Sequence, residues 1–336
     1  MKYQALVLLL LCLTTSLLFA QDYRLKKTET NISSSFRGLS VVNNKVAWLS
    51  GSQGWVGRTI DGGLTWSFNQ VAGFEESEFR SLYAFDDQRA VIANAGSPAH
   101  ILLTTDGGKK WNPVYTKTHP DAFFDGIDFW NDQEGMIYGD PIDGKMLLLH
   151  TTDGGVNWNE INGPKLEKGE ASFAASGTGI RCINNNQVMI STGGVVSRLW
   201  ISKDKGLSWS SIKAPMVQGE STTGIFSFVR NRNVIIIVGG DYKKESMAIN
   251  HNFYSPSEGS HWFTPNSPTR GYRECVEPIK RNTLVAVGPS GVDLSFDNGI
   301  NWKPFSDEKG LHVVRKSRKG SLVIAAGGKG QVFVIE

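Results

Sequence analysis

The stretch Thr59-Ile60-Asp61-Gly62-Gly63-Leu64-Thr65-Trp66 decides the fold, because the chain repeats it at a regular interval. Four further copies keep the aspartate and the tryptophan, and they occupy residues 104–111, 151–158, 202–209 and 295–302. A sixth copy at 255–262 has Ser257 in place of the aspartate. The positions that correspond to the aspartate follow one another at intervals of 45, 47, 51, 53 and 40 residues. Such a period is typical of a β-propeller in which each repeat forms one four-stranded blade.

The repeated stretch, which we call a box, has the chemistry of a tight turn. The Ser or Thr hydroxyl and the Asp carboxylate accept backbone N–H groups, glycine adopts positive φ, and tryptophan packs the turn onto the blade. Six of the ten tryptophans of the chain lie in boxes. We therefore expect a structural and not a catalytic role for Asp61, Asp106, Asp153, Asp204 and Asp297 and for Trp66, Trp111, Trp158, Trp209 and Trp302.

A second pattern precedes each box and marks the innermost strand of a blade. Its clearest copies are Phe36-Arg37-Gly38-Leu39, Phe79-Arg80-Ser81-Leu82 and Phe124-Asp125-Gly126-Ile127. Later copies begin at the glycines 179, 224, 271 and 310. Seven copies predict seven blades, one more than the number of boxes.

The seventh blade lacks an outer strand of its own, because the chain ends after three predicted strands. Residues 22–30 precede the first repeat, and we expect them to supply the missing strand, which closes the ring and removes exposed sheet edges. The prediction is an all-β, seven-bladed β-propeller of four-stranded antiparallel blades in a single domain at 21–336. The expected blades are 31–70, 71–116, 117–163, 164–214, 215–266, 267–306, and 307–336 together with 22–30.

Residues 1–20 have the composition of a secretory signal peptide, with one positive charge at Lys2, an apolar run and Ala20 at the expected cleavage position. No later stretch approaches the roughly 20 apolar residues of a membrane helix. We expect export to the periplasm or the exterior, with no membrane-spanning segment in the mature chain.

The remaining composition excludes several classes of protein. Cys182 and Cys275 are the only cysteines beyond the predicted leader, which excludes a disulfide-stapled scaffold, and we expect both to be buried thiols. The formal charge is +3 with no block of like charges, which gives no case for nucleic acid. The histidines show no ligand spacing. We expect a monomer with no metal and no cofactor.

The Thr-Thr-Asp-Gly-Gly boxes at 104–108 and 151–155, with the Arg-Gly and Arg-Ser strand openings, resemble the Asp-box or BNR propellers, and most closely the Ycf48/Hcf136-type photosystem II assembly factors. The resemblance implies a non-catalytic, exported protein that helps membrane complexes assemble. A photosystem partner does not follow, because proteins with this pattern also occur without photosynthesis. The chain departs from the pattern in its degenerate box at Ser257 and in an insertion at 241–246.

The loops that enter the innermost strands share one face of a propeller, where ligands usually bind. The residues just before each opening glycine or serine are Arg37, Arg80, Asp125, Thr178, Thr223, Arg270 and Lys309. This ring is predicted to be net positive, and we take Arg37, Arg80, Asp125, Arg270 and Lys309 as candidate binding residues for a protein or an acidic ligand. The alternative is that the arginines pair with carboxylates such as Asp125, Glu76 or Glu78 and only hold the ring together.

An enzymatic alternative uses the same face. A sialidase needs three arginines and a Tyr–Glu pair, which Arg37, Arg80 and Arg270 with Tyr272 and Glu274 would supply. However, the expected Ile-Pro after the first arginine is missing, and sialidases have six blades. Another glycosidase would use a carboxylate pair, for which Asp125 and Asp140 are the best candidates. The segment 140–144 is interpreted as a turn and not as a calcium loop.

Overall fold

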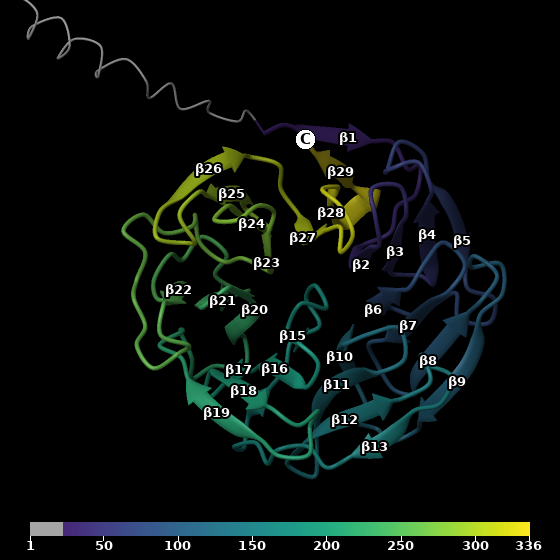
Figure 1. Ribbon diagram of the computed structural model, residues 1–336, viewed down its shortest axis with the longest axis horizontal. Helices are drawn as coiled ribbons and strands as arrows, with labels where there is room; N and C mark the ends of the chain where they lie inside the picture. The colour runs from purple at the N-terminus through teal and green to yellow at the C-terminus, as the bar shows by residue number, and fades with distance from the viewer. Residues whose placement is uncertain (1–22) are drawn as a thin grey trace, which may run out of the picture.

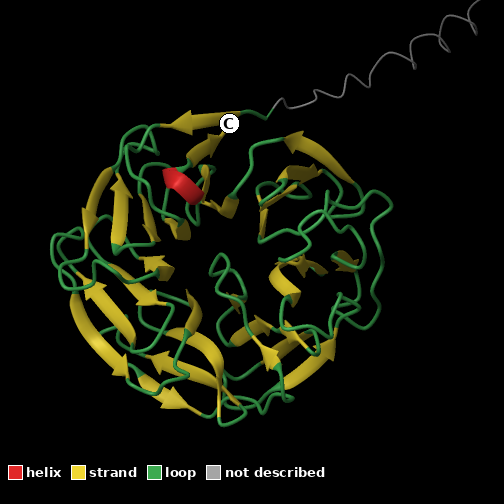
Figure 2. Ribbon diagram, turned by 180° about the vertical axis from the view of Figure 1, so that it is seen from behind, coloured by secondary structure: helices red, strands yellow, loops and turns green. Residues whose placement is uncertain are grey.

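The computed structural model describes residues 23–336, which form 29 β-strands and one short 3-10 helix. The predicted leader at 1–20 lies outside the described residues. Seven sheets are arranged in a ring around a central channel (Figure 1). Strands and loops make up almost the whole ring (Figure 2). The predicted seven-bladed, all-β propeller is confirmed. No helix within 23–336 is both long enough and apolar enough to cross a membrane.

The first three blades along the chain are antiparallel meanders that run outward from the channel. They comprise β2 (Phe36–Val41), β3 (Ala47–Gly51), β4 (Trp55–Thr59) and β5 (Ser67–Gln70); β6 (Phe79–Ala84), β7 (Ala90–Asn94), β8 (Ala99–Thr104) and β9 (Asn112–Lys117); and β10 (Phe124–Phe129), β11 (Gly135–Ile142), β12 (Lys145–Thr151) and β13 (Asn159–Ile161).

The next three blades include the least regular one. The fourth is β15 (Ile180–Ile183), β16 (Gln187–Ser191), β18 (Arg198–Ser202) and β19 (Ser210–Lys213), and the sixth is β23 (Cys275–Pro278), β24 (Leu284–Gly288), β25 (Gly291–Ser295) and β26 (Trp302–Ser306). The fifth has β20 (Thr223–Asn231), β21 (Val234–Asp241) and β22 (Asn252–Ser255), with the short β14 (Glu170–Ala171) and β17 (Gly193–Gly194) added at its inner edge. Its outer strand is reduced to one bridge between Tyr254 and Phe263, in the blade whose box lacks the aspartate.

The closing blade joins the two ends of the described chain. It comprises β27 (Leu311–Lys316), β28 (Val323–Gly327), the helix η1 (Gly328–Gly330), β29 (Val332–Ile335) and, as its outer strand, β1 (Leu25–Thr28). Strand β1 pairs antiparallel with β29, from Leu25 opposite Ile335 to Thr28 opposite Val332 (Figure 1). The predicted closure of the ring by the N-terminal segment is confirmed.

The core lies between neighbouring blades, and this explains the sequence of the second strands. Every residue of β3 is buried, because each face of the strand is covered by an adjacent blade. Trp48 of β3, for example, packs in one cluster with Phe79, Ile92 and Leu102 of the next blade. Strands buried on both faces are continuous apolar runs without alternation.

Each box closes a turn next to the loop between the first two strands of its blade. Asp106 accepts the Lys110 N–H at 3.0 Å and the Thr104 hydroxyl at 2.9 Å, and the same hydroxyl accepts the Gly108 N–H at 3.1 Å. The Gly107 N–H binds the Gln88 carbonyl at 2.9 Å in the neighbouring loop. The boxes therefore lie on the exit face, where the innermost strands end. The entry face, where these strands begin, is free for other loops.

Candidate functional site

A β-bulge near the start of the innermost strand fixes which side chains surround the channel. In the first blade Phe36 pairs with Gly51 and Gly38 with Ser50, which leaves Arg37 out of register. A bulge of this kind redirects the side chain of the extra residue. The strand pairing of four other blades skips Arg80, Asp125, Phe226 and His312 in the same way.

Two more residues occupy the equivalent position by the same register. In the sixth blade Cys275 pairs with Val287, the residue before Gly288, so Glu274 corresponds to Arg37. In the fourth blade Ile180 pairs with Ile190, which puts Thr178 at this position. The residues at the bulge positions are Arg37, Arg80, Asp125, Thr178, Phe226, Glu274 and His312.

The predicted ring was therefore wrong in three blades. It had Thr223, Arg270 and Lys309 where the structure has Phe226, Glu274 and His312. The prediction counted from glycines 224, 271 and 310. Gly271 and Gly310 belong to the incoming loops, and Gly224 lies in β20 two residues before Phe226. The register is set instead by pairing with a glycine at or near the end of the second strand. In the last three blades these are residues 239, 288 and 327, and counting from them would have located the correct residues.

Six of the seven residues at the bulge positions, all except Thr178, line a cavity of about 680 Å³ at the entry face, which we call the entry mouth. Its charged lining comprises Arg37, Arg80, Asp125, Asp140, Glu245 and Glu274, with His312 beside them. Two arginines face four carboxylic acids, so the mouth has mixed charge. The prediction of a net positive ring is not supported by this lining.

Arg37 is held in a buried network. Its Nη1 lies 2.6 Å from Glu274 Oε2 and 2.8 Å from the Ala175 carbonyl oxygen. His312 Nδ1 lies 3.0 Å from the same Glu274 oxygen. Burial alone would raise the pKa of Glu274, but Arg37 and His312 outweigh it and hold the pKa below its usual value. For Arg37, the interpretation of the arginines as structural residues fits this geometry.

Arg80 is more accessible. Its Nε and Nη2 donate to one oxygen of Glu78 at 3.0 and 2.9 Å. About a third of the Arg80 side chain and 40% of the Glu78 side chain remain exposed. Exposed pairs of this kind are worth little, so a ligand carboxylate can replace Glu78 at small cost.

Asp125 is the most unusual group in the mouth. It has no exposed surface, and neither carboxylate oxygen has a hydrogen-bond partner among the described residues. Burial, with a smaller contribution from Asp140, raises its pKa well above the ordinary value. Burial also raises the pKa of Asp140, whose Oδ1 accepts the Ser172 N–H at 3.1 Å. Both aspartates line the cavity.

Arg270 and Lys309 do not belong to the lining of the mouth. Arg270 binds Asp293 at 3.0 Å and Asp307 at 2.6 Å and donates to two backbone carbonyls. Its guanidinium is therefore engaged in ion pairs and hydrogen bonds within the protein. The fully buried Arg273 contacts the same Asp293. Lys309 is exposed. A binding role for Arg270 or Lys309 stays a prediction.

An aromatic wall completes the mouth, and the sequence did not indicate it. Phe173 stacks on Phe226 with ring centroids 3.9 Å apart, and Tyr272 meets Phe226 edge-on at 4.7 Å. Tyr242 adds a further edge contact at 6.2 Å and is 44% exposed. Phe173 and Tyr242 lie in long loops outside the repeat, where no period identifies them. The aromatic residues in these loops were the only available signal.

The geometry argues against the sialidase arrangement. Tyr272 is buried at 2% exposure, Glu274 is engaged by Arg37 and His312, and Arg270 lies outside the mouth. Among residues 23–336 no group of three or more His, Cys, Asp or Glu side chains is placed to hold a metal ion. Cys182 and Cys275 are free thiols, of which Cys275 is buried and Cys182 partly so.

Comparisons with known proteins agree with this architecture. The profile of a family described as "Photosynthesis system II assembly factor YCF48" matches residues 19–120 and 95–233. The search of proteins with curated function gave no significant match.

Two similar structures are described as "YCF48 bound to D1 peptide", covering 93% of this chain and 96% of that one, and "YCF48 from Cyanidioschyzon merolae", covering 94% and 99%. Each has 16% identity and a TM-score of 0.67. A third, the GH74 enzyme of Niastella koreensis, has 13% identity and a TM-score of 0.63 over 91% of this chain and 53% of that one. At these identities the structures show a shared fold.

Proposed function

The chain belongs to the family of the photosynthesis system II assembly factor YCF48, and from this premise we propose that it is an exported, non-catalytic scaffold that binds a protein partner at the entry mouth. The observation that carries the proposal is the cavity of about 680 Å³, which combines an aromatic wall with charged groups. Aromatic and arginine side chains are the residues that most often dominate protein interfaces.

The similar structure of YCF48 bound to a D1 peptide supports a peptide segment as the occupant, since YCF48 has the same fold and binds a peptide. The partner of this protein need not be D1. We propose that it inserts an apolar side chain against Phe226 and Tyr242 and that an acidic group replaces Glu78 on Arg80. Arg37 supports the mouth from within and does not contact the partner directly.

Site-specific crosslinking tests this proposal. A photoreactive phenylalanine at Tyr242, on the mouth, is compared with the same group at Leu207, which is 84% exposed in a box turn on the exit face. After irradiation of intact cells we expect one defined adduct from position 242 and none from 207. Arg80→Glu, introduced beside the crosslinker at 242, should abolish the adduct, whereas Lys110→Gln on an exit-face turn should not. Equal adducts from both positions, or indifference to Arg80→Glu, would refute the proposal.

Export is a separate part of the proposal and rests on the signal-peptide composition of residues 1–20. Fractionation of cells with N-terminal sequencing of the mature protein tests it. A chain that starts near residue 21 in the periplasm or medium supports export. A full-length chain in the cytoplasm refutes it and leaves the binding proposal standing.

A glycosidase remains the second hypothesis, because Asp125 and Asp140 line one cavity. Such an enzyme needs one protonated and one ionised carboxyl group that both reach the sugar. Burial raises the pKa of both groups here, and Asp125 has no exposed surface, which favours binding over hydrolysis. Release of reducing sugar from a polysaccharide panel, lost in Asp140→Asn, would support the enzyme.

A further inference from the structure

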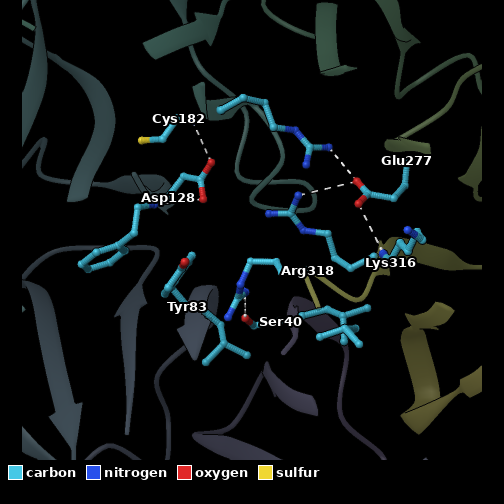
Figure 3. Close-up of a pocket in the computed structure, with 13 residues that line it drawn as sticks. Ser40, Tyr83, Asp128, Cys182, Glu277, Lys316 and Arg318 are labelled. Carbon is cyan, nitrogen blue, oxygen red and sulfur yellow. Dashed lines mark hydrogen bonds and ion pairs between the residues drawn. The ribbon is translucent and has the colours of Figure 1, made fainter. Parts of the chain in front are cut away.

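A second cavity, of about 230 Å³, lies at the opposite end of the channel, where the innermost strands finish (Figure 3). We call it the exit pocket. Its charged lining residues are Asp128, Arg181, Glu277, Arg315, Lys316 and Arg318. They come from β10, β15, β23 and β27 and from the loop that follows β27. None of them lines the entry mouth, so the pocket is a separate site.

The exit pocket holds more positive than negative charge. Four basic side chains share the lining with two carboxylic acids. One oxygen of Glu277 serves two guanidinium groups, at 2.9 Å from Arg181 and 3.7 Å from Arg315. All three of these side chains are largely buried. Among the described residues, Glu277 is thus the carboxylate at ion-pair distance from both cations.

Asp128 acts on these arginines without a direct ion pair. Its two oxygens accept the backbone N–H groups of Phe129 at 2.9 Å and Cys182 at 2.8 Å. Figure 3 shows the bond between Cys182 and Asp128. Burial is the main influence on its pKa, which is raised despite the nearby arginines Arg315 and Arg181. The hydrogen bonds of the carboxylate therefore go to the backbone, and it acts on Arg181 and Arg315 through its charge at longer range.

Arg315 is the least satisfied cation of the pocket. Arg181 donates to two backbone carbonyls as well as to Glu277, and Arg318 donates to the Ser40 hydroxyl at 2.9 Å. Within residues 23–336 the Arg315 guanidinium makes one ion pair, the 3.7 Å contact with Glu277, and no hydrogen bond, although it carries five N–H donors. Burial, and then repulsion from Arg181, lower its pKa.

Arg318 is held in place beside this group. Its guanidinium carbon lies 4.3 Å from the centroid of the Tyr83 ring, a cation–π contact that fixes the long side chain. Figure 3 shows Arg318 and Tyr83 next to each other at the pocket, with the bond from Arg318 to Ser40. The residue itself is exposed, so the pocket can be reached from the exit face.

We propose that the exit pocket binds a small oxyanion, a phosphate or a carboxylate, between the guanidinium groups of Arg315 and Arg318. Planar guanidinium groups match the oxygens of such anions in a bidentate way. A buried cation without a full partner is costly, and a bound anion supplies the missing charge and acceptors. Because a water occupies about 30 Å³, the cavity has room for an oxyanion together with several waters.

Isothermal titration of the purified mature protein tests the site. Inorganic phosphate and malonate are titrated in separate arms at pH 7, and sodium chloride holds the ionic strength constant so that screening does not differ. Saturable binding of phosphate identifies a phosphate site, and saturable binding of malonate alone identifies a carboxylate site. Heat of dilution only, in both arms, would overturn the proposal.

The variants tie the binding to the pocket. Arg315→Gln and Arg318→Gln are each expected to weaken the bound anion at least tenfold. Lys110→Gln, which removes an exposed cation from the same face, should leave the affinity unchanged. Arg318→Gln preserves the Arg181–Glu277 pair, so it decides the matter even if Arg315→Gln does not fold. Wild-type affinity in a folded Arg318→Gln protein would refute the assignment.

Discussion

The two ends of the central channel are built from the same innermost strands, yet they differ in size, charge and backbone. The entry mouth measures about 680 Å³ and has two arginines against four carboxylic acids, whereas the exit pocket measures about 230 Å³ and has four basic groups against two acids. Six side chains of the mouth come from the bulge position of the innermost strands, whereas the charged side chains of the exit pocket come from further along these strands and from the loop after β27. The overall charge of +3 predicts neither end, because local placement decides the field at each.

The two ends of the channel also use arginine differently. At the exit pocket Arg181 is embedded among carbonyls and a buried carboxylate. At the mouth Arg80 pairs with a half-exposed Glu78. Buried pairs are costly to break, while exposed pairs contribute little. The exit arginine should therefore stabilise the ring, and the mouth arginine should be available for binding.

The largest expected effect on the free energy of unfolding is that of a substitution at the exit pocket. Arg181→Ala removes the closer partner of Glu277 and leaves two backbone carbonyls without a donor. We expect a loss of about 3–5 kcal/mol in the free energy of unfolding, which is typical of a broken buried pair. Urea unfolding followed by tryptophan fluorescence measures it, with Lys110→Gln as the control. A loss below about 1 kcal/mol would mean that the Arg181–Glu277 pair is effectively solvated. The exit arginine would then not differ from the mouth arginine in its contribution to stability.

Asp125→Asn should stabilise the protein at neutral pH, by about 1–3 kcal/mol, because the carboxyl is buried without a partner. Its folded pKa is raised above the unfolded value near 3.8, so the wild type loses stability as pH rises above that value. The advantage of the variant is therefore absent at pH below 3.8 and grows as the pH rises. Urea unfolding of both proteins from pH 3 to pH 8 measures this difference.

Asp106→Asn on the exit face is the matched control with the opposite sign. The Lys110 N–H bond is the main cause that lowers the pKa of Asp106. The Asp106 carboxylate therefore adds to the free energy of unfolding above the unfolded pKa, and this contribution is lost as pH falls through the folded pKa. Asp106→Asn should destabilise the protein at neutral pH and match the wild type in acid. The same pH slope for both variants would contradict the pKa directions at one of the two faces.

The degenerate box offers a smaller test of what makes the exit face rigid. Ser257 accepts the His261 N–H at 3.0 Å, as the aspartates do in the other boxes, but it has no second oxygen. Ser257→Asp should shorten the present 3.4 Å contact with the Ser255 hydroxyl to the 2.7–2.9 Å of the other boxes and raise the free energy of unfolding by about 0.5–1 kcal/mol. Ser257→Ala should lower it. If both variants unfold at the wild-type urea concentration, the boxes do not limit stability at this face.

The repeat was enough to predict the fold, because turn chemistry and apolar strands recur at a fixed period and each blade obeys the same packing. It was not enough for the mouth. Three of the seven channel positions were misplaced, because glycines 224, 271 and 310 precede the channel residue in their blades and were taken for the glycine that follows it. Phe173 and Tyr242 lie in insertions that have no counterpart in other blades. The exit pocket was not predicted, because Arg181 and Arg315 lie in β15 and β27. There a charged residue fits the ordinary alternation of apolar and polar side chains along a strand.

The smallest expected effect on stability is that of Arg80→Ala at the mouth. Its pair with Glu78 is partly exposed, and such pairs contribute about 0.2–1 kcal/mol, so we expect a change near the lower limit. Urea unfolding measures this change, and crosslinking from position 242 measures partner binding in the same variant. Normal stability together with a lost adduct would show that this arginine serves recognition and not folding. A loss of several kcal/mol would instead place Arg80 with Arg181 among the residues that hold the ring together, and the functional contrast between the two ends would disappear.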